Sequence, residues 1–368
     1  MIVTGLRGVG KTVLLEHFRQ IAAQQKWVVI DREITKHDED DFRRSLSAWM
    51  RTAILGLSPR DRWSDRLKAA LGVLRSFSLS VDPEGRLSAG IDVGVEYGVA
   101  DQGILQHDVT DLFVAAGEAA REHRRGIIML LDEIQFLAAP QLEALIVGLH
   151  KTTQRNLPVT IVGAGLPQIP ELAGDAKSYS ERLFAFPQIG NLPDDQAKVA
   201  LQEAARQEGA SWTDQALDLA VAQTEGYPYF LQELGYATWL VADANQITKG
   251  HVERALPQYE NKLDSSFFRV RLDRTTDLQR AYLRVMAELG PEPQKAADVA
   301  ERLNRTSSQV APARAELISM GLLYTPQHGY AAFTVPQFDR YMKRMMPTFT
   351  VPVLRPRQPT GTKSHKLS

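Results

Sequence analysis

The chain has 368 residues, which is too long for one small hydrophobic core and predicts two or three domains. It contains no cysteine, and this excludes disulfides, thiolate catalysis and Cys-ligated zinc. The hydrophobic content of 44% is typical of a soluble protein, and no apolar run is long enough to span a membrane. The start, MIVTG, lacks the features of a secretory signal. We therefore expect a cytoplasmic protein.

The formal net charge of -1 is unevenly distributed along the chain. Residues 275–346 carry nine Lys and Arg against seven Asp and Glu, and residues 347–368 carry four against none. The remaining residues, 1–274, therefore hold a net charge of -7. This count indicates an acidic body with a mildly basic C-terminal end.

The N-terminal part of the chain alternates between β-type and helical patterns. Residues 2–4 are a short apolar run that leads directly into GLRGVGKT, and residues 11–25 then repeat apolar side chains at helical spacing. Residues 27–30 predict a second strand. From 38 to about 76 the pattern is helical, with a break at Ser58-Pro59.

Two features follow before the centre of the chain. Residues 78–105 alternate and are rich in Gly, Asp and Val, which predicts a β-hairpin inserted in the domain. Asp108 is expected to cap the N-terminus of a helix that runs to about Arg124.

The central part of the chain predicts strands that are buried on both faces. Residues 127–131 (IIMLL) and residues 159–162 are continuous apolar runs, and residues 141–154 between them have a helical pattern. Strands that alternate with helices indicate a doubly wound α/β fold with a parallel sheet. Beyond Gly190 the strand pattern ends, and residues 194–256 predict consecutive helices joined by short loops.

Residues 277–346 have the layout of a winged helix. Three helical segments are expected, of which the third runs from Ser307 to Met320, and two strands then pair around residues 326–329, which would form the wing. The tail VPVLRPRQPTGTKSHKLS has three prolines and no periodicity, and we expect it to be disordered.

GLRGVGKT has the spacing G-x-x-x-x-G-K-T of a phosphate-binding loop. Its glycines let the backbone turn so that several N–H groups point at phosphate oxygens, and the following helix adds its positive N-terminal end. We expect Lys11 to reach the β- and γ-phosphates and the Thr12 hydroxyl to bind Mg²⁺. A chance glycine-rich turn is the alternative, but the strand and the amphipathic helix on either side argue against it. The residues of this loop expected to contact the nucleotide are Gly5, Leu6, Arg7, Gly8, Val9, Gly10, Lys11, Thr12 and Val13.

Asp132 and Glu133 directly follow the apolar run of LLDEIQFL. Asp132 would hold Mg²⁺ through water, and Glu133 would orient and deprotonate the water that attacks the terminal phosphate. The alternative is that Asp132 caps the next turn and Glu133 is only solvated. Because the phosphate-binding loop is present in the same chain, the catalytic interpretation is favoured.

The order GLRGVGKT, LLDEIQFL, VGAGLPQIP, SYSERLFAF resembles AAA+ ATPases, and most of all the origin-recognition-like and archaeal-type ATPases with a C-terminal winged helix. The resemblance covers about residues 1–346 and implies Mg²⁺-dependent binding and hydrolysis of ATP. It implies a P-loop ATPase domain over residues 1–190, a helical lid over 191–268 and a winged-helix domain over 269–346, with the basic tail after them.

The resemblance also gives roles to residues beyond the two phosphate-site motifs. Arg182 stands where such proteins carry an arginine finger that is donated to a neighbour's ATP in an ATP-dependent homo-oligomer; a surface Arg paired with Glu181 or Asp175 is the alternative. Gly163-Ala164-Gly165 stands where a polar residue is expected after the fourth strand, and Tyr227-Pro228-Tyr229 stands where an Arg of the lid would contact the γ-phosphate. Both departures favour slow hydrolysis.

These observations lead to a slow ATPase switch that contacts double-stranded DNA through its winged helix. The alternative is a signalling (STAND-like) ATPase whose winged helix docks a protein, because the charge excess of the C-terminal unit is modest for DNA binding. A small-molecule kinase fits poorly, since it would leave Glu133 without its water. The expected DNA contacts are Ser308, Gln309 and Arg314 at base edges, Arg305 and His328 at phosphates, and Lys363 and Lys366 in the tail.

Overall fold

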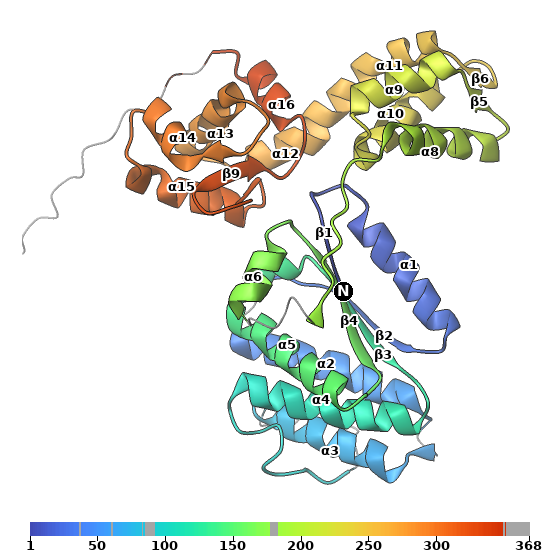
Figure 1. Cartoon of the computed structure of the whole chain (residues 1–368), viewed down its shortest axis with the longest axis vertical. Helices are drawn as coiled ribbons and strands as arrows, with labels where there is room; N and C mark the ends of the chain where they lie inside the picture. The colour runs from blue at the N-terminus through green and yellow to red at the C-terminus, as the bar shows by residue number, and fades with distance from the viewer. Residues whose placement is uncertain are drawn as a thin grey trace, which may run out of the picture. The chain divides into compact units, whose positions relative to one another are not determined.

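The computed structural model describes residues 1–36, 38–59, 62–82, 84, 93–176, 183–348 and 350. The chain forms two compact units, residues 1–259 and residues 260–368 (Figure 1). Arg182, Lys363 and Lys366 lie outside the described residues, as does the tail from residue 351 onwards. In the described part of the chain, no helix combines the length and the apolar character that crossing a membrane requires.

A parallel sheet forms the centre of the first unit. Its strands are β1 (Ile2–Thr4), β2 (Val28–Glu33), β3 (Ile127–Asp132) and β4 (Val159–Gly165), in the spatial order β1-β4-β3-β2. β4 therefore lies between β1, which leads into the glycine loop, and β3, which ends at Asp132. At the outer edge of β1, the N–H groups of Ile2 and Thr4 donate to the carbonyls of Ala185 and Pro187. The predicted α/β fold with a parallel sheet is confirmed.

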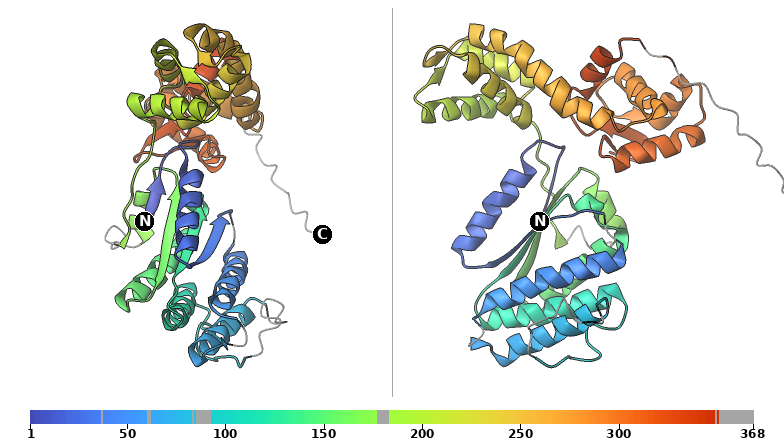
Figure 2. Two further views of the ribbon diagram at one scale, coloured as in Figure 1. Left: turned by 90° about the vertical axis from the view of Figure 1, so that its right-hand side faces the viewer. Right: turned by 180° about the vertical axis from the view of Figure 1, so that it is seen from behind.

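The side chains of β3 alternate between two apolar layers. Ile128 and Leu130 pack with the helix α1 (Lys11–Gln24) on one face. Ile127, Met129 and Leu131 pack with the helices of the opposite face. Because both faces are buried, the strand is a continuous apolar run in the sequence. α1 covers one face of the sheet, and α2, α4 and α5 cover the other, with α3 packed on α2 and α4 (Figure 2). These helices are α1 (Lys11–Gln24), α2 (Glu39–Leu57), α3 (Asp65–Leu79), α4 (Leu105–Glu122), α5 (Ala139–Gln154) and α6 (Ile169–Ala176).

The segment between α3 and α4 differs from the expected β-hairpin at 78–105. Residues 78 and 79 complete α3, and residues 93–104 form turns without a strand, while residues 83 and 85–92 lie outside the described part. Residues 93–96 instead bind the side of α3, where Arg75 Nη1 donates to the Val93 carbonyl at 2.6 Å and Ser76 Oγ donates to the Glu96 carbonyl at 2.7 Å. The hairpin prediction is wrong for the described residues, because short polar alternation with glycines also suits a turn-rich loop.

Asp108 lies inside α4, so its predicted role as the N-cap is wrong. The helix begins at Leu105, and the Asp108 side chain is fully buried. Its Oδ2 accepts a hydrogen bond from Arg43 Nη1 of α2 at 2.8 Å, and its Oδ1 accepts one from the Gln102 N–H at 2.9 Å. A buried carboxylate requires such partners, and this one joins two helices and the preceding loop.

Beyond residue 190 the first unit continues as a bundle of helices. Its aromatic core includes Tyr227 and Phe230, whose ring centroids lie 4.6 Å apart. The consecutive helices predicted for residues 194–256 are observed, and the structure adds two strands that are too short to produce a sequence pattern. The elements are α8 (Asp194–Gln207), β5 (Ser211–Trp212), α9 (Asp214–Thr224), α10 (Pro228–Val241), β6 (Gln246–Ile247) and α11 (Lys249–Lys262), with β5 parallel to β6.

The second unit combines helices with a small antiparallel sheet. The three helices and the pair of strands predicted for residues 277–346 are present, and β7 and α16 are additional. The strand order is β7-β9-β8, and Phe268, Phe338 and Tyr341 form an aromatic core in which the rings of Phe268 and Tyr341 stack at 4.8 Å. After a π-helical segment (Leu263–Phe268), the elements are α12 (Arg269–Leu272), α13 (Asp277–Leu289), β7 (Gln294–Lys295), α14 (Ala296–Arg302), α15 (Ser307–Ser319), β8 (Leu323–Tyr324), β9 (Tyr330–Phe333) and α16 (Phe338–Met345).

Candidate functional site

The glycine loop connects β1 to α1, and each of its glycines has a steric reason. Gly8 and Gly10 have φ values of +82° and +96°, a backbone region that residues with a Cβ rarely adopt. At Gly5 the limit is space, since an added Cβ would lie 2.4 Å from the Ile189 carbonyl oxygen. The loop therefore makes a tight turn at positions where only glycine fits, as the sequence G-x-x-x-x-G-K-T of a phosphate-binding loop requires.

Lys11, the first residue of α1, is buried and turns back into the loop. Its Nζ donates to the carbonyl oxygens of Leu6 at 2.7 Å and Gly5 at 3.0 Å. Burial lowers the pKa of Lys11 below its ordinary value, while the carboxylates of Glu133 and Asp132 oppose that shift. A phosphate that reached this ammonium group would replace neutral carbonyls with a charged partner, which is a stronger hydrogen bond.

Thr12 and Asp132 come together at the carboxyl end of the sheet. Thr12 Oγ1 donates to Asp132 Oδ2 at 2.6 Å, and Asp132 Oδ1 accepts from the Glu133 N–H at 2.8 Å. A hydroxyl and a carboxylate are the hard oxygen donors that Mg²⁺ prefers, so this pair fits the metal expected from the sequence. Among the described residues there is no cluster of three or more His, Asp or Glu that could hold a metal by themselves.

Glu133 occupies an unusual backbone position directly after β3. Its φ of +53° is in the left-handed region, which few residues other than glycine adopt. Its Oε2 accepts a hydrogen bond from Gln135 Nε2 and lies 4.0 Å from Nη2 of Arg7 in the glycine loop. Strained residues of this kind often occur at functional sites. Because its carboxylate lies near Arg7, the Glu133 side chain faces the loop that would hold the phosphates.

Residues 1–162 match the family model of the AAA ATPase domain, and residues 265–342 match a domain of unknown function (DUF8462). The chain carries an AAA ATPase domain. Its glycine loop, its acidic strand end and its parallel sheet all lie within the matched region or directly beside it, so the AAA+ type P-loop fold expected from the motifs is confirmed.

One solved structure supports the same fold. The Walker-type ATPase PABY2304 of Pyrococcus abyssi is 14% identical, with a TM-score of 0.51, over 93% of this chain and 90% of its own. At this level of identity the likeness to PABY2304 establishes the fold and no substrate. More distant likenesses are to the ORC1 protein of Aeropyrum pernix, solved in complex with DNA (15% identical, TM-score 0.41, 93% and 86%), and to the RuvB Holliday junction branch migration motor of Thermotoga maritima (14% identical, TM-score 0.42, 93% and 86%). No curated protein matches the chain.

The end of β4 in the AAA domain confirms that no polar side chain follows this strand, and shows what lies there instead. The residues are Gly163, Ala164 and Gly165, and the N–H of the next residue, Leu166, donates to Oε1 of Gln135 at 3.2 Å. Gln135 lies in the 3₁₀ turn after β3. Gln135 was not predicted as a site residue, and its position two residues after Glu133 is the signal that the sequence offers for it.

The N-terminus of α10 touches the glycine loop of the AAA domain. The Tyr229 N–H donates to the Gly8 carbonyl at 3.2 Å, and a Cβ on Gly8 would lie 2.9 Å from the Tyr227 hydroxyl oxygen. Tyr227-Pro228-Tyr229 supplies no cation, as the sequence indicates, but its backbone binds the loop directly. This contact also was not predicted.

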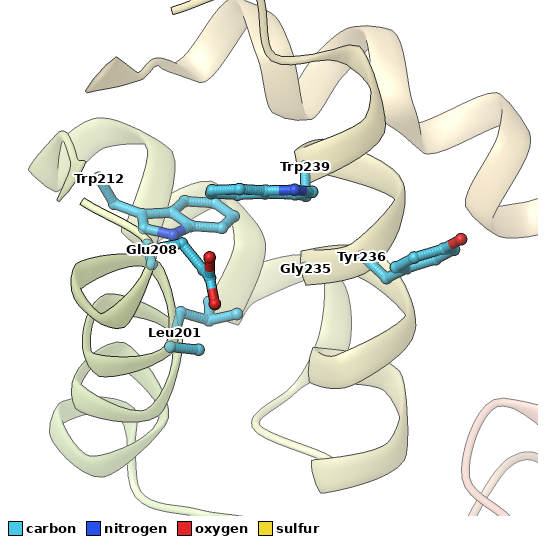
Figure 3. Close-up of a pocket in the computed structure, with 8 residues that line it drawn as sticks. Leu201, Glu208, Trp212, Gly235, Tyr236 and Trp239 are labelled. Atoms are coloured by element: carbon cyan, nitrogen blue, oxygen red, sulfur yellow. The ribbon is translucent and has the colours of Figure 1, made fainter. Parts of the chain in front are cut away.

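A second concave region lies between α8 and α10. It is an open groove with a volume of about 270 Å³ (Figure 3). A neighbouring hollow of about 330 Å³ shares Leu201, Ala204, Gly235 and Tyr236 with it. Trp212 and Trp239 line one end, with Glu208 beside them. The residues that line the groove include Glu208 but no Lys, Arg or His, so the groove offers no cation for a phosphate and does not compete with the glycine loop as the nucleotide site.

Proposed function

We propose that the protein is an ATP-dependent molecular switch that binds Mg·ATP at the glycine loop and hydrolyses it slowly. The observation that carries the proposal is the hydrogen bond of 2.6 Å between Thr12 and Asp132, which joins the two phosphate-site motifs into one site. The match of residues 1–162 to the AAA ATPase domain supports it.

Each residue of the site has a separate role in this proposal. The loop N–H groups and Lys11 bind the phosphates, and Lys11 exchanges the Gly5 and Leu6 carbonyls for phosphate oxygens. Thr12 and Asp132 would hold Mg²⁺, which supplies charge neutralisation at the phosphate oxygens when bound. Glu133 accepts the proton of the water that attacks the terminal phosphate, and the products of ATP and water are ADP and inorganic phosphate.

Slow turnover is supported by the groups found beside the glycine loop. Neither β4 nor the start of α10 places a charged side chain at the loop. A slow switch needs only occasional hydrolysis, and these features suit that task.

The decisive experiment compares wild type with Glu133→Gln and Lys11→Ala for nucleotide binding and for phosphate release. Glu133→Gln should bind ATP as tightly as wild type and lose turnover, because a carboxamide cannot accept the proton. Lys11→Ala should lose most of its affinity. Equal phosphate release by wild type and Glu133→Gln would overturn the assignment of Glu133, and absence of ATP binding by wild type would overturn the function itself.

We also propose that Arg182 acts on the ATP of a neighbouring copy in an ATP-dependent homo-oligomer, a role that rests on the resemblance alone. Arg182→Ala should bind ATP and hydrolyse it poorly, and mixing it with Lys11→Ala should restore part of the activity, because one composite site then has both intact components. If mixing restores nothing and light scattering shows no ATP-dependent increase in mass, Arg182 has no role in trans.

For the second unit the winged-helix interpretation is a proposal supported by its order of elements, helix-strand-helix-helix-strand-strand, over α13 to β9. DNA contact is one candidate. The surface of α15 favours the other candidate, docking of a protein partner. The exposed positions of α15 carry no Lys or Arg, and its one cation, Arg314, is half-buried. Gln309 is used inside its own helix terminus, where its Oε1 accepts from the Thr306 N–H at 2.9 Å.

A further inference from the structure

Gln135 forms two hydrogen bonds that fix the orientation of its amide. Its Nε2 donates to Glu133 Oε2, and its Oε1 accepts from the Leu166 N–H at 3.2 Å. A carboxylate can only accept and an N–H can only donate, so turning the amide over would lose both bonds. The Gln135 side chain therefore connects the end of β4 to the carboxylate of Glu133 in one defined direction.

The absence of a side chain at the end of β4 makes room for this arrangement. A Cβ on Gly165 would lie 2.7 Å from Gln135 Oε1, a distance at which the amide would have to move. Gly165 has no need of glycine for its backbone angles, since its φ is not in the left-handed region. The close approach of the Gln135 amide thus accounts for glycine at a position where the resemblance leads us to expect a polar residue.

We infer that Gln135 is a positioning residue, which takes the place of the missing polar residue of β4 and holds the Glu133 carboxylate for its reaction with water. The inference rests on the proposed function of Glu133. Because Gln135 engages Oε2, the other oxygen, Oε1, is the one assigned to the water.

The test is steady-state ATP hydrolysis by Gln135→Met, which keeps the volume of the side chain and removes both hydrogen bonds. The kcat should fall roughly tenfold, the loss expected when a hydrogen bond to a charged group is removed. The KM for ATP should be unchanged, because the two hydrogen bonds of the Gln135 side chain are made with Glu133 and Leu166, which lie outside the glycine loop. Wild-type kcat in Gln135→Met would overturn the inference.

A second variant separates the two hydrogen bonds of Gln135. In Gln135→Glu, the new carboxylate can still accept from the Leu166 N–H, but when ionised it cannot donate to Glu133 Oε2. The kcat should therefore fall as in Gln135→Met while the KM for ATP stays unchanged, a split that a merely structural residue would not produce. A wild-type kcat in this variant would contradict a role for the hydrogen bond from Gln135 to Glu133.

A third variant moves the amide without altering it. Gly165→Ala introduces the Cβ that would displace Gln135 Oε1, and it should lower kcat as Gln135→Met does. The matched control is Gly190→Ala, in which the added Cβ meets no atom within 4 Å, and kcat should be unchanged. Gly165→Ala keeps the inference testable if Gln135→Met fails to fold. Glu133→Gln is measured in parallel: if it hydrolyses ATP like wild type, the proposed function fails, and if only the Gln135 and Gly165 variants resemble wild type, the inference alone fails.

Discussion

Thr12 and Asp132 are 120 positions apart in the sequence, yet Thr12 Oγ1 donates a hydrogen bond of 2.6 Å to Asp132 Oδ2. The sheet order explains how they meet. β4 separates β1 from β3, and the loop after β1 brings the start of α1 across the end of β4 towards Asp132. The glycine loop therefore crosses the width of one strand, β4, to bring Thr12 next to Asp132.

The first prediction concerns Mg²⁺. Without Mg²⁺, Thr12→Ala should bind ATP as well as wild type does. The increase in ATP affinity that Mg²⁺ causes should be about tenfold smaller in Thr12→Ala than in wild type, because one oxygen ligand of the metal is removed. Fluorescence titration with a labelled ATP analogue, with and without Mg²⁺, measures this. Thr52→Ala, at an exposed threonine that binds only its own helix, is the matched control. An equal Mg²⁺ effect in Thr12→Ala and wild type would exclude Thr12 as a ligand.

The second prediction concerns alkaline pH. Burial lowers the pKa of Lys11 from its ordinary value of 10.5. Bound phosphate favours the charged form, so the affinity for ATP should be complete below the pKa of Lys11 in the free protein and should fall as the pH rises through that pKa, which lies below 10.5. Titrations without Mg²⁺ between about pH 7.5 and 10 test this. Lys11→Arg stays charged throughout this range, and its affinity should be independent of pH; equal slopes in the two proteins would contradict the prediction.

The third prediction concerns the buried pair of Arg43 and Asp108. Asp108→Ala leaves a buried guanidinium without its main partner and should lower the free energy of unfolding by about 3–5 kcal/mol. A helix cap, the role expected from the sequence, would cost only about 1 kcal/mol. All five tryptophans belong to the first unit, so urea unfolding followed by tryptophan fluorescence reports on it. Arg44→Ala, which breaks the exposed pair with Asp41, is the control and should cost less than about 1 kcal/mol.

The fourth prediction concerns DNA. Because α15 exposes no Lys or Arg, we expect no binding of a labelled duplex to the intact protein with ATP at about 0.1 M salt, and no difference between wild type and Arg305→Ala. Fluorescence anisotropy across a salt series decides the question. Binding with a steep salt dependence, whose slope falls by about one unit in Arg305→Ala, would instead support DNA contact by this unit.

The sequence predicted those parts of the site that depend on local residue types. The glycines, Lys11 and the apolar run before Asp132 have strict local requirements, and a motif with its flanking strand and helix is enough to show them. Gln135 was missed because its partners are a carboxylate two residues away and a backbone N–H on another strand, and only the register of β3 and β4 makes them neighbours. Asp108 was misread for a related reason: burial against Arg43 comes from the packing of α2 on α4, and no periodicity encodes it.

The hydrogen bond from the Tyr229 N–H to the Gly8 carbonyl has a consequence for signalling within the first unit. In the proposed function the N–H groups of the glycine loop bind the phosphates, whereas the carbonyl of Gly8 accepts a hydrogen bond from the first turn of α10. If occupancy of the cradle turns the Gly8 peptide, which its glycine backbone permits, the amide proton of Tyr229 loses its acceptor and becomes open to exchange with solvent. Nucleotide binding would then be coupled to the helical bundle through the single peptide group of Gly8, without a chain of contacting side chains between the two.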